Sequence, residues 1–524
     1  MLLTGDYSQL YKAIVLLEEA RGFSVPIKMF LMKLYCYMGA MDTCTDLYEA
    51  LAIKHIQVES LGFLPMRYIQ AVGSFGYAGQ FYRTALRFYY SCSKETTEYV
   101  IQAYKNGTFH KITEMIDFAE RISYSLNFAY IIVDTHMMEF CTTIHSVEKA
   151  KEFFSKEWFS GLPYSASKLE AYCDKLTDGR NLTVFEDWSP PHRKMKPEEV
   201  KASFELECHW LRIRVNILQC LKQALGLLEV PPAAPQASPQ EHTSEAVSAL
   251  ESRVRELSQT ARLTRGLRGY ELLKQREKNP LLPIQSPPPS LAYMLLENNL
   301  DELVVQVLCA LVQIAHGEQS VNDTLQQAIK VAKSVQATMR GVPDTLRTAF
   351  ERVSQGDMDI QTEHPYKIMT RTHIDLEKYV LFMQTARRRK KKKKGQSKEM
   401  SVLENELVEF LKELQQVVVE ASRQFKPLPE FGKLSKNLSE LYMKNSDAGP
   451  DKQDGVSDKQ ISTESDKDQR KAAESVTDAN KTAFMSVCRS VLESYSDSFQ
   501  AVHDMVVAKT EFINSIISRL GGVV

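Results

Sequence analysis

Apolar residues recur at helical spacing near the start of the chain, in three stretches that share one design: an aromatic-rich helix, a glycine, and a second helix. These stretches cover residues 27–53, 63–90 and 96–122. Their central glycines are Gly39, Gly76 and Gly107, which lie 37 and 31 residues apart. Since helical hairpins of about 34 residues stack into solenoids, the pattern predicts a helical-repeat scaffold rather than a catalyst.

The same 3.6-residue spacing of apolar positions predicts further helices downstream. They cover residues 126–142, 146–159, 165–177, 198–228 and 244–277. Residues 178–197 combine turn residues with paired prolines, so we expect a structured loop there. Because no succession of strands is apparent, the predicted class is all-α: a tetratricopeptide-like helical-repeat solenoid with a further α-helical C-terminal region.

Changes in composition divide the chain into a series of predicted segments. In order, these are tetratricopeptide-like hairpin repeats at 1–160, helices plus the structured loop 178–197 at 161–229, a proline-rich linker at 230–243, a helical region at 244–385, a basic loop at 386–400, helices at 401–444, a disordered segment at 445–481 and a C-terminal helix at 482–524.

The overall charge and the cysteines exclude several classes of protein. With 25% charged residues and a formal net charge of -1, the chain lacks the basic excess of a protein that binds nucleic acid with its whole surface. Its nine cysteines are odd in number and never spaced as CxxC, so neither a disulfide framework nor a cysteine zinc site is expected. The first residues lack a basic lead, and the most apolar run, 303–315, is too short for a membrane span. We therefore expect a cytoplasmic protein.

One concentrated charge stands out, a run of eight basic residues inside the predicted loop 386–400. It consists of Arg387, Arg388, Arg389, Lys390, Lys391, Lys392, Lys393 and Lys394. Such a run is usually a solvated loop, but it also attracts phosphate, so a contact with ribosomal RNA is the alternative. No aromatic residues interleave it, which argues against recognition of particular bases.

Motifs of enzymatic chemistry are missing from the sequence. There is no serine-nucleophile motif, no GxGxxG and no GxxxxGK[ST] phosphate loop. We therefore expect no catalytic, cofactor-binding or metal-binding residues in this chain.

The sequence resembles the auxiliary subunits of the N-terminal acetyltransferase B complex, NatB. Three segments carry the resemblance: LYCYMGAMDTCTDLYEALAIKHIQ, SFGYAGQFYRTALRFYYSCSKETTEYVIQAYKNGTFHKITEMIDFAERI and DGRNLTVFEDWSPP. Family members are longer and carry further repeats ahead of the point where this chain begins. The chain therefore resembles a carboxy-terminal portion or a short isoform.

The resemblance implies a non-catalytic partner. A superhelix of tetratricopeptide-type repeats would wrap the small catalytic subunit and help to place it at the ribosome, where the complex acetylates nascent chains that begin Met-Asp, Met-Glu, Met-Asn or Met-Gln. Acetyl-CoA would be bound by that partner, not by this chain. Consistent with this division, Gly76-Tyr77-Ala78 fits only the end of the acetyltransferase cofactor loop, because Gly73 stands where that loop has Arg or Gln.

The structured loop is the candidate contact with the catalytic subunit. It places charges and an aromatic side chain on one ordered turn, namely Asp178, Arg180, Glu186, Asp187 and Trp188. A loop that only braces neighbouring repeats would have the same composition, so both interpretations stay open. For the whole chain, the alternative function is a ribosome- or RNA-binding adaptor that acts through the basic run without an acetyltransferase.

Overall fold

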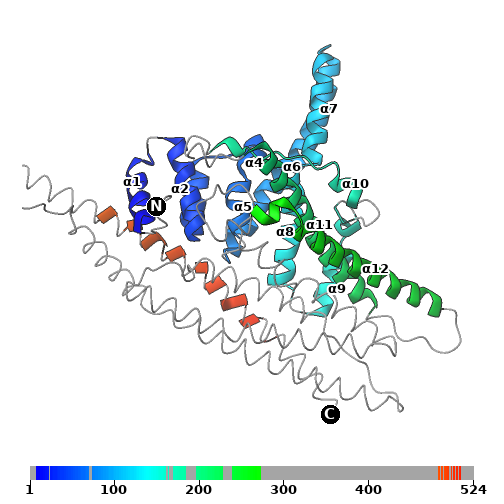
Figure 1. The fold of residues 1–524 in the computed structure, drawn as a ribbon. Coiled ribbons are helices and arrows are strands. Elements are labelled where there is room, and N and C mark those ends of the chain that lie inside the picture. The colour runs from blue at the N-terminus through cyan, green and yellow to red at the C-terminus, as the bar shows by residue number, and fades with distance from the viewer. Residues whose placement is uncertain are drawn as a thin grey trace, which may run out of the picture.

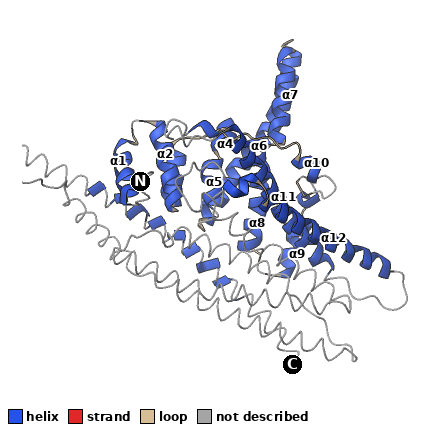
Figure 2. Cartoon of the chain, in the orientation of Figure 1, coloured by secondary structure: helices blue, strands red, loops and turns tan. Residues whose placement is uncertain are grey.

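The computed structural model describes residues 8–272, with gaps at 23, 70–72, 145, 161–162, 165–168, 185–195 and 228–238, and helical positions between 482 and 511. Within these residues the chain forms helices and no strand (Figures 1 and 2), with one isolated bridge between Ser125 and Thr177. The all-α prediction is confirmed. No helix of this described part is long and apolar enough to cross a membrane.

The first predicted hairpin is present. Helix α1 (Ser8–Ala20) is followed by α2 (Val25–Met38) and α3 (Met41–Ala50). Gly39 separates the last two with a left-handed φ of 76°, and its N–H donates to the Cys36 carbonyl at 3.1 Å. A residue with a side chain would be strained in this conformation, so the glycine specifies where α2 ends.

The turn of the second hairpin was predicted at the wrong glycine. After α4 (Ile56–Leu61), helix α5 (Phe63–Ile69) precedes a turn at Gly73, whose φ is 79°. Gly76 instead lies in the first turn of α6 (Phe75–Lys105). Two glycines three residues apart are both compatible with a turn in the sequence, but only Gly73 adopts the left-handed conformation that requires glycine.

The third predicted turn is correct, but the helix before it also belongs to the second predicted hairpin. Gly107 has a φ of 71° and separates α6 from α7 (His110–Ser123). Because α6 is one continuous helix of 31 residues, the second helix of the second predicted hairpin and the first helix of the third are the same element. The outer part of α6 pairs with α7, which projects away from the remaining helices in Figure 1.

Helix α8 (Leu126–Thr142) has the predicted bounds, and the Ser125 hydroxyl caps it by accepting from the Phe128 N–H at 3.1 Å. The predicted helix 146–159 is in fact two elements, α9 (Val147–Ser155) and the short 3₁₀ helix η1 (Glu157–Ser160), because Lys156 is extended. Helix α10 (Leu169–Cys173) ends before the predicted residue 177, and residues 165–168 of the predicted helix lie outside the described residues.

Helix α11 (Pro197–Leu227) agrees with the predicted 198–228 within one residue. Helix α12 (Pro239–Arg265) begins inside the predicted linker 230–243 and ends before the predicted residue 277. Proline fits the first turn of a helix, because no intrahelical hydrogen bond is lost there. The predicted segments 386–400, 401–444 and 445–481, and most of 244–385, lie outside the described residues.

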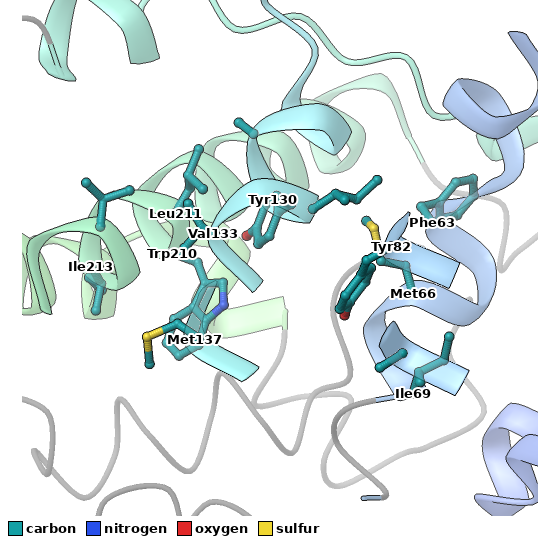
Figure 3. Close-up of a cluster of buried hydrophobic side chains, with 14 of the residues drawn as sticks. Phe63, Met66, Ile69, Tyr82, Tyr130, Val133, Met137, Trp210, Leu211 and Ile213 are labelled. Carbon is teal, nitrogen blue, oxygen red and sulfur yellow. The ribbon is translucent and has the colours of Figure 1, made fainter. Parts of the chain in front are cut away.

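The core is centred on α8 and α11. Figure 3 shows buried side chains from four helices meeting there, contributed by α5 (Phe63, Met66, Ile69), α6 (Tyr82), α8 (Tyr130, Val133, Met137) and α11 (Trp210, Leu211, Ile213). The Tyr130 hydroxyl donates to the Glu207 carbonyl at 2.9 Å, so its polar end is satisfied inside the apolar core. Helices from widely separated parts of the sequence are thereby held in one body.

Candidate functional site

The first residues of the predicted contact loop are held against three helices by backbone hydrogen bonds. The Thr177 N–H donates to the Tyr124 carbonyl at 2.8 Å, and the Thr177 carbonyl accepts from the Leu126 N–H at 3.1 Å. Further on, the Asn181 N–H donates to the Ser60 carbonyl at 2.9 Å. Residues 177–181 therefore connect α4, α7 and α8, whereas residues 185–195 of the predicted loop lie outside the described residues.

Arg180 points inward from this loop. Only 1% of its side chain is exposed, and its guanidinium donates twice to the Asp178 carboxylate, from Nε at 2.8 Å and from Nη2 at 2.7 Å. Its Nη1 lies 3.3 Å from Oε1 of Glu207 on α11, which is equally buried. Burial alone would lower the pKa of Arg180, but the hydrogen bonds with Asp178 and the charge of Glu207 outweigh it and raise the pKa.

A second buried carboxyl group lies on the other side of the loop. Glu59 of α4 is 6% exposed, and its Oε2 accepts from the Tyr89 hydroxyl at 2.5 Å and the Ser125 hydroxyl at 2.6 Å. Burial raises the pKa of Glu59, although these two hydrogen bonds act in the opposite direction. The loop passes so close that a Cβ at Gly179 would collide with the Glu59 carboxyl group.

These side chains form two polar clusters, one of Glu59, Tyr89 and Ser125 and one of Asp178, Arg180 and Glu207, which we together call the Glu59–Arg180 network. The first cluster joins α4, α6 and the residue that caps α8, and the second joins the loop to α11. Removing one member of a buried ion pair typically costs about 3–5 kcal/mol, because the other charge is left uncompensated. The network therefore locks the loop to the helices.

The predicted contact residues differ in how far the structure exposes them. The Arg180 guanidinium is enclosed, which favours the bracing interpretation for that residue. The Asp178 side chain is 22% exposed and pairs with Arg180. Glu186, Asp187 and Trp188 lie outside the described residues, as does the basic run Arg387–Lys394, so their predicted contacts stay predictions.

Sequence reasoning missed both buried glutamates. A signal for Glu207 was present, because Ser203, Glu207, Trp210 and Arg214 follow one another at intervals of four, three and four residues on one face of α11. All four are buried. A carboxylate on the same face as a tryptophan indicates a buried charge that needs a partner. Glu59, on a helix of only six residues, gave no comparable signal.

The described residues offer little chemistry beyond this network. They contain no group of three or more His, Cys, Asp or Glu side chains that could hold a metal ion. The ring of His136 packs against aromatic side chains, and its Nδ1 lies 2.7 Å from the Tyr164 hydroxyl. Burial lowers the pKa of this histidine to about 3, which keeps it neutral. These surroundings indicate a structural role for His136.

Comparisons with known proteins find similarity in the amino-terminal part of the chain. Residues 3–177 match the family model described as "N-acetyltransferase B complex (NatB) non catalytic subunit". The human "N-alpha-acetyltransferase 25, NatB auxiliary subunit" is 35% identical over 225 residues, which cover 42% of this chain and 22% of the relative. The Drosophila pseudoobscura pseudoobscura "Phagocyte signaling-impaired protein" is 26% identical over 231 residues, 44% of this chain and 23% of the relative.

A solved structure, "The NatB Acetyltransferase Complex Bound To CoA and MES", overlays with a TM-score of 0.44 at 14% identity, covering 95% of this chain and 50% of that one, a likeness too weak to build on. The chain spans about a fifth of the length of its curated relatives. The resemblance seen in the sequence is confirmed as a similarity: residues 3–177 match the model of the non-catalytic NatB subunits, and the relatives named as NatB auxiliary subunits align with this part of the protein.

Proposed function

We propose that the chain is a non-catalytic scaffold that binds and positions the catalytic subunit of NatB for co-translational acetylation of Met-Asp, Met-Glu, Met-Asn and Met-Gln N-termini. The observation that carries this proposal is the match of residues 3–177 to the non-catalytic NatB subunits. In this role the catalytic partner binds acetyl-CoA, and the complex works in the cytoplasm at the ribosome.

The fold supports such a role through its rigidity. A stable protein interface buries about 1,200–2,000 Å², and ordering loops or side chains on binding lowers the affinity. Here the Glu59–Arg180 network and the core around α8 and α11 order the surface before a partner arrives. A preformed surface of this kind holds a bound enzyme in a productive geometry without supplying any reacting group.

The test is reconstitution from purified components. The full chain is mixed with the NatB catalytic subunit, run on size-exclusion chromatography and assayed with acetyl-CoA and a Met-Asp peptide. We expect an equimolar complex that acetylates this peptide faster than the catalytic subunit alone, while the chain alone shows no activity. A peptide that begins Ser-Ala serves as the substrate control. Separate elution of the two proteins at micromolar concentrations would contradict the proposal.

The eight consecutive basic residues support a second candidate, a ribosome-binding adaptor that works without an acetyltransferase. For this candidate, ribosome pelleting would retain the chain in the absence of the catalytic subunit. Retention would fall steeply between about 50 and 200 mM salt and on replacement of Arg387–Lys394 by serines. Complex formation with the catalytic subunit, unaffected by that replacement, would favour the scaffold.

A further inference from the structure

The outward face of α6 carries a regular stripe of cations and apolar side chains. Its positions alternate at intervals of four and three residues over about 32 Å of helix. We call the following seven residues the α6 stripe: Arg83, Arg87, Tyr90, Lys94, Thr97, Ile101 and Tyr104. All seven are exposed, and the three large apolar side chains expose 61% (Tyr90), 50% (Ile101) and 69% (Tyr104) of their surface.

The stripe lies on another side of α6 than the residues that this helix buries, and its inner end adjoins α8, where the rings of Tyr90 and Phe128 pack edge to face with centroids 5.9 Å apart. The residues that α6 buries form a different face, on which Tyr82, Ala85, Tyr89, Thr96 and Ala103 follow helical spacing. The outer end of the helix belongs to the hairpin with α7, whose projection from the body is visible in Figure 1. The stripe is therefore accessible along its length.

The cations of the stripe are available for binding. Within the part of the chain that the structure describes, Arg83, Arg87 and Lys94 form no ion pair. At the outer end, the rings of Tyr104 and Phe109 pack edge to face with centroids 5.6 Å apart, so an apolar surface is held in place there. Exposed apolar residues scattered singly need no explanation, but three of them on the same stripe as three cations do.

We propose that the α6 stripe is a docking site for an acidic, amphipathic helix of a partner protein. The alternating four- and three-residue spacing is that of the seam along which two helices pack. A partner helix with apolar residues at the same spacing would cover Tyr90, Ile101 and Tyr104. Its aspartates and glutamates would pair with Arg83, Arg87 and Lys94, and arginine would do so bidentately.

The charges around the stripe favour an acidic helix over RNA. Residues 83–121 hold six Lys and Arg but also five Asp and Glu, so the hairpin as a whole is almost neutral. The acids include Glu98, next to the stripe on α6, and Glu114, Asp117 and Glu120 on α7. A polyphosphate chain would meet these carboxylates, whereas a helix can place its own acids opposite the three cations only.

The test uses a labelled probe peptide of three Glu/Leu heptads, with leucine at the seam positions, and measures its fluorescence anisotropy with the full chain. We expect binding that the triple variant Arg83→Glu/Arg87→Glu/Lys94→Glu weakens at least about tenfold. The matched control is Lys54→Glu/Lys149→Glu/Lys201→Glu, which reverses three exposed cations on other segments. It should leave the affinity unchanged.

Two further arms examine the apolar part of the site. A peptide of the same composition, scrambled so that its leucines form no seam, should bind several-fold more weakly than the probe. The probe itself should bind several-fold more weakly to the variant Ile101→Ser/Tyr104→Ser than to the wild type. Circular dichroism confirms that each variant is folded. The proposal is overturned if the charge reversal changes the affinity by less than about twofold, if the scrambled peptide binds equally well, or if poly(U) RNA binds through the stripe and the peptide does not.

Discussion

At Gly179 the backbone passes directly against the buried carboxyl group of Glu59. The sequence Asp178-Gly179-Arg180 is typical of a turn, and turn glycines are usually explained by a left-handed φ. Here the requirement is different, because the glycine lets the backbone approach Glu59. This requirement depends on two segments more than 100 residues apart in the sequence, so no local pattern predicts it.

We expect Gly179→Ala to lower the free energy of unfolding by about 1–3 kcal/mol, since the new Cβ would push the Glu59 carboxyl group away from Tyr89 and Ser125. The matched control is Gly76→Ala. A Cβ there meets nothing within 4 Å, and alanine favours the helix, so we expect no loss of stability. Urea unfolding followed by circular dichroism measures both. Equal effects of the two substitutions would contradict the role assigned to Gly179.

At the scale of elements, the sequence predicts helices well where a long apolar stripe or a clear cap defines them. Helices α8 and α11 agree with prediction to within a residue, because both bury one continuous face. The helix predicted to end at residue 177 ends earlier, because the backbone of Thr177 forms hydrogen bonds with Tyr124 and Leu126, which are distant in the sequence. The bounds of a helix can thus be predicted from local patterns, except where its backbone forms hydrogen bonds with segments distant in the sequence.

One contact between elements is sensitive to pH. The Asp42 N–H in the first turn of α3 donates to the hydroxyl of Ser494, in the C-terminal helical segment, at 3.0 Å. Burial, together with the charge of Asp497 and a hydrogen bond to it, raises the pKa of Asp42 from 3.8 to about 7. The charge of Asp46 acts in the same direction. Two carboxyl groups that meet at a half-buried contact are most stable when they share a proton.

We therefore expect this contact to weaken as the pH rises. The folded protein holds a proton on Asp42 that the unfolded chain releases near pH 4, so stability falls from about pH 4 to about pH 7 and then levels off. The variant Asp42→Asn should be less sensitive to pH than the wild type over this range. Urea unfolding at about pH 5 and about pH 8, below and above the pKa of about 7 of Asp42, compares them. The control Asp117→Asn, at an exposed position of α7, should behave like the wild type.

For the whole molecule, burial is distributed unevenly. Ten of the 17 residues of α8 and 19 of the 31 residues of α11 are buried, whereas α7 buries only Ile122. The apolar spacing predicted the helical class, which the described residues confirm, and the resemblance to NatB auxiliary subunits predicted the similarity that the comparisons find over residues 3–177. The sequence did not predict this uneven burial, because exposure depends on which helices pack against which, and aromatic residues are even more frequent in α6, with its exposed outer half, than in the buried α8.

The uneven burial predicts a gradient of local stability, which hydrogen–deuterium exchange can measure. We expect amides of α8, α11 and the inner half of α6 to exchange slowly, and those of residues 93–119 to exchange faster, since that stretch buries only Thr96 and Ala103. The inner half of α6 is the matched control, because it belongs to the same helix. Equal protection of both halves in the isolated chain would mean that the outer hairpin is already covered, for instance by self-association. The acidic probe peptide should slow exchange in the outer half of α6 selectively, because a docked helix stabilises the hairpin only in its bound form.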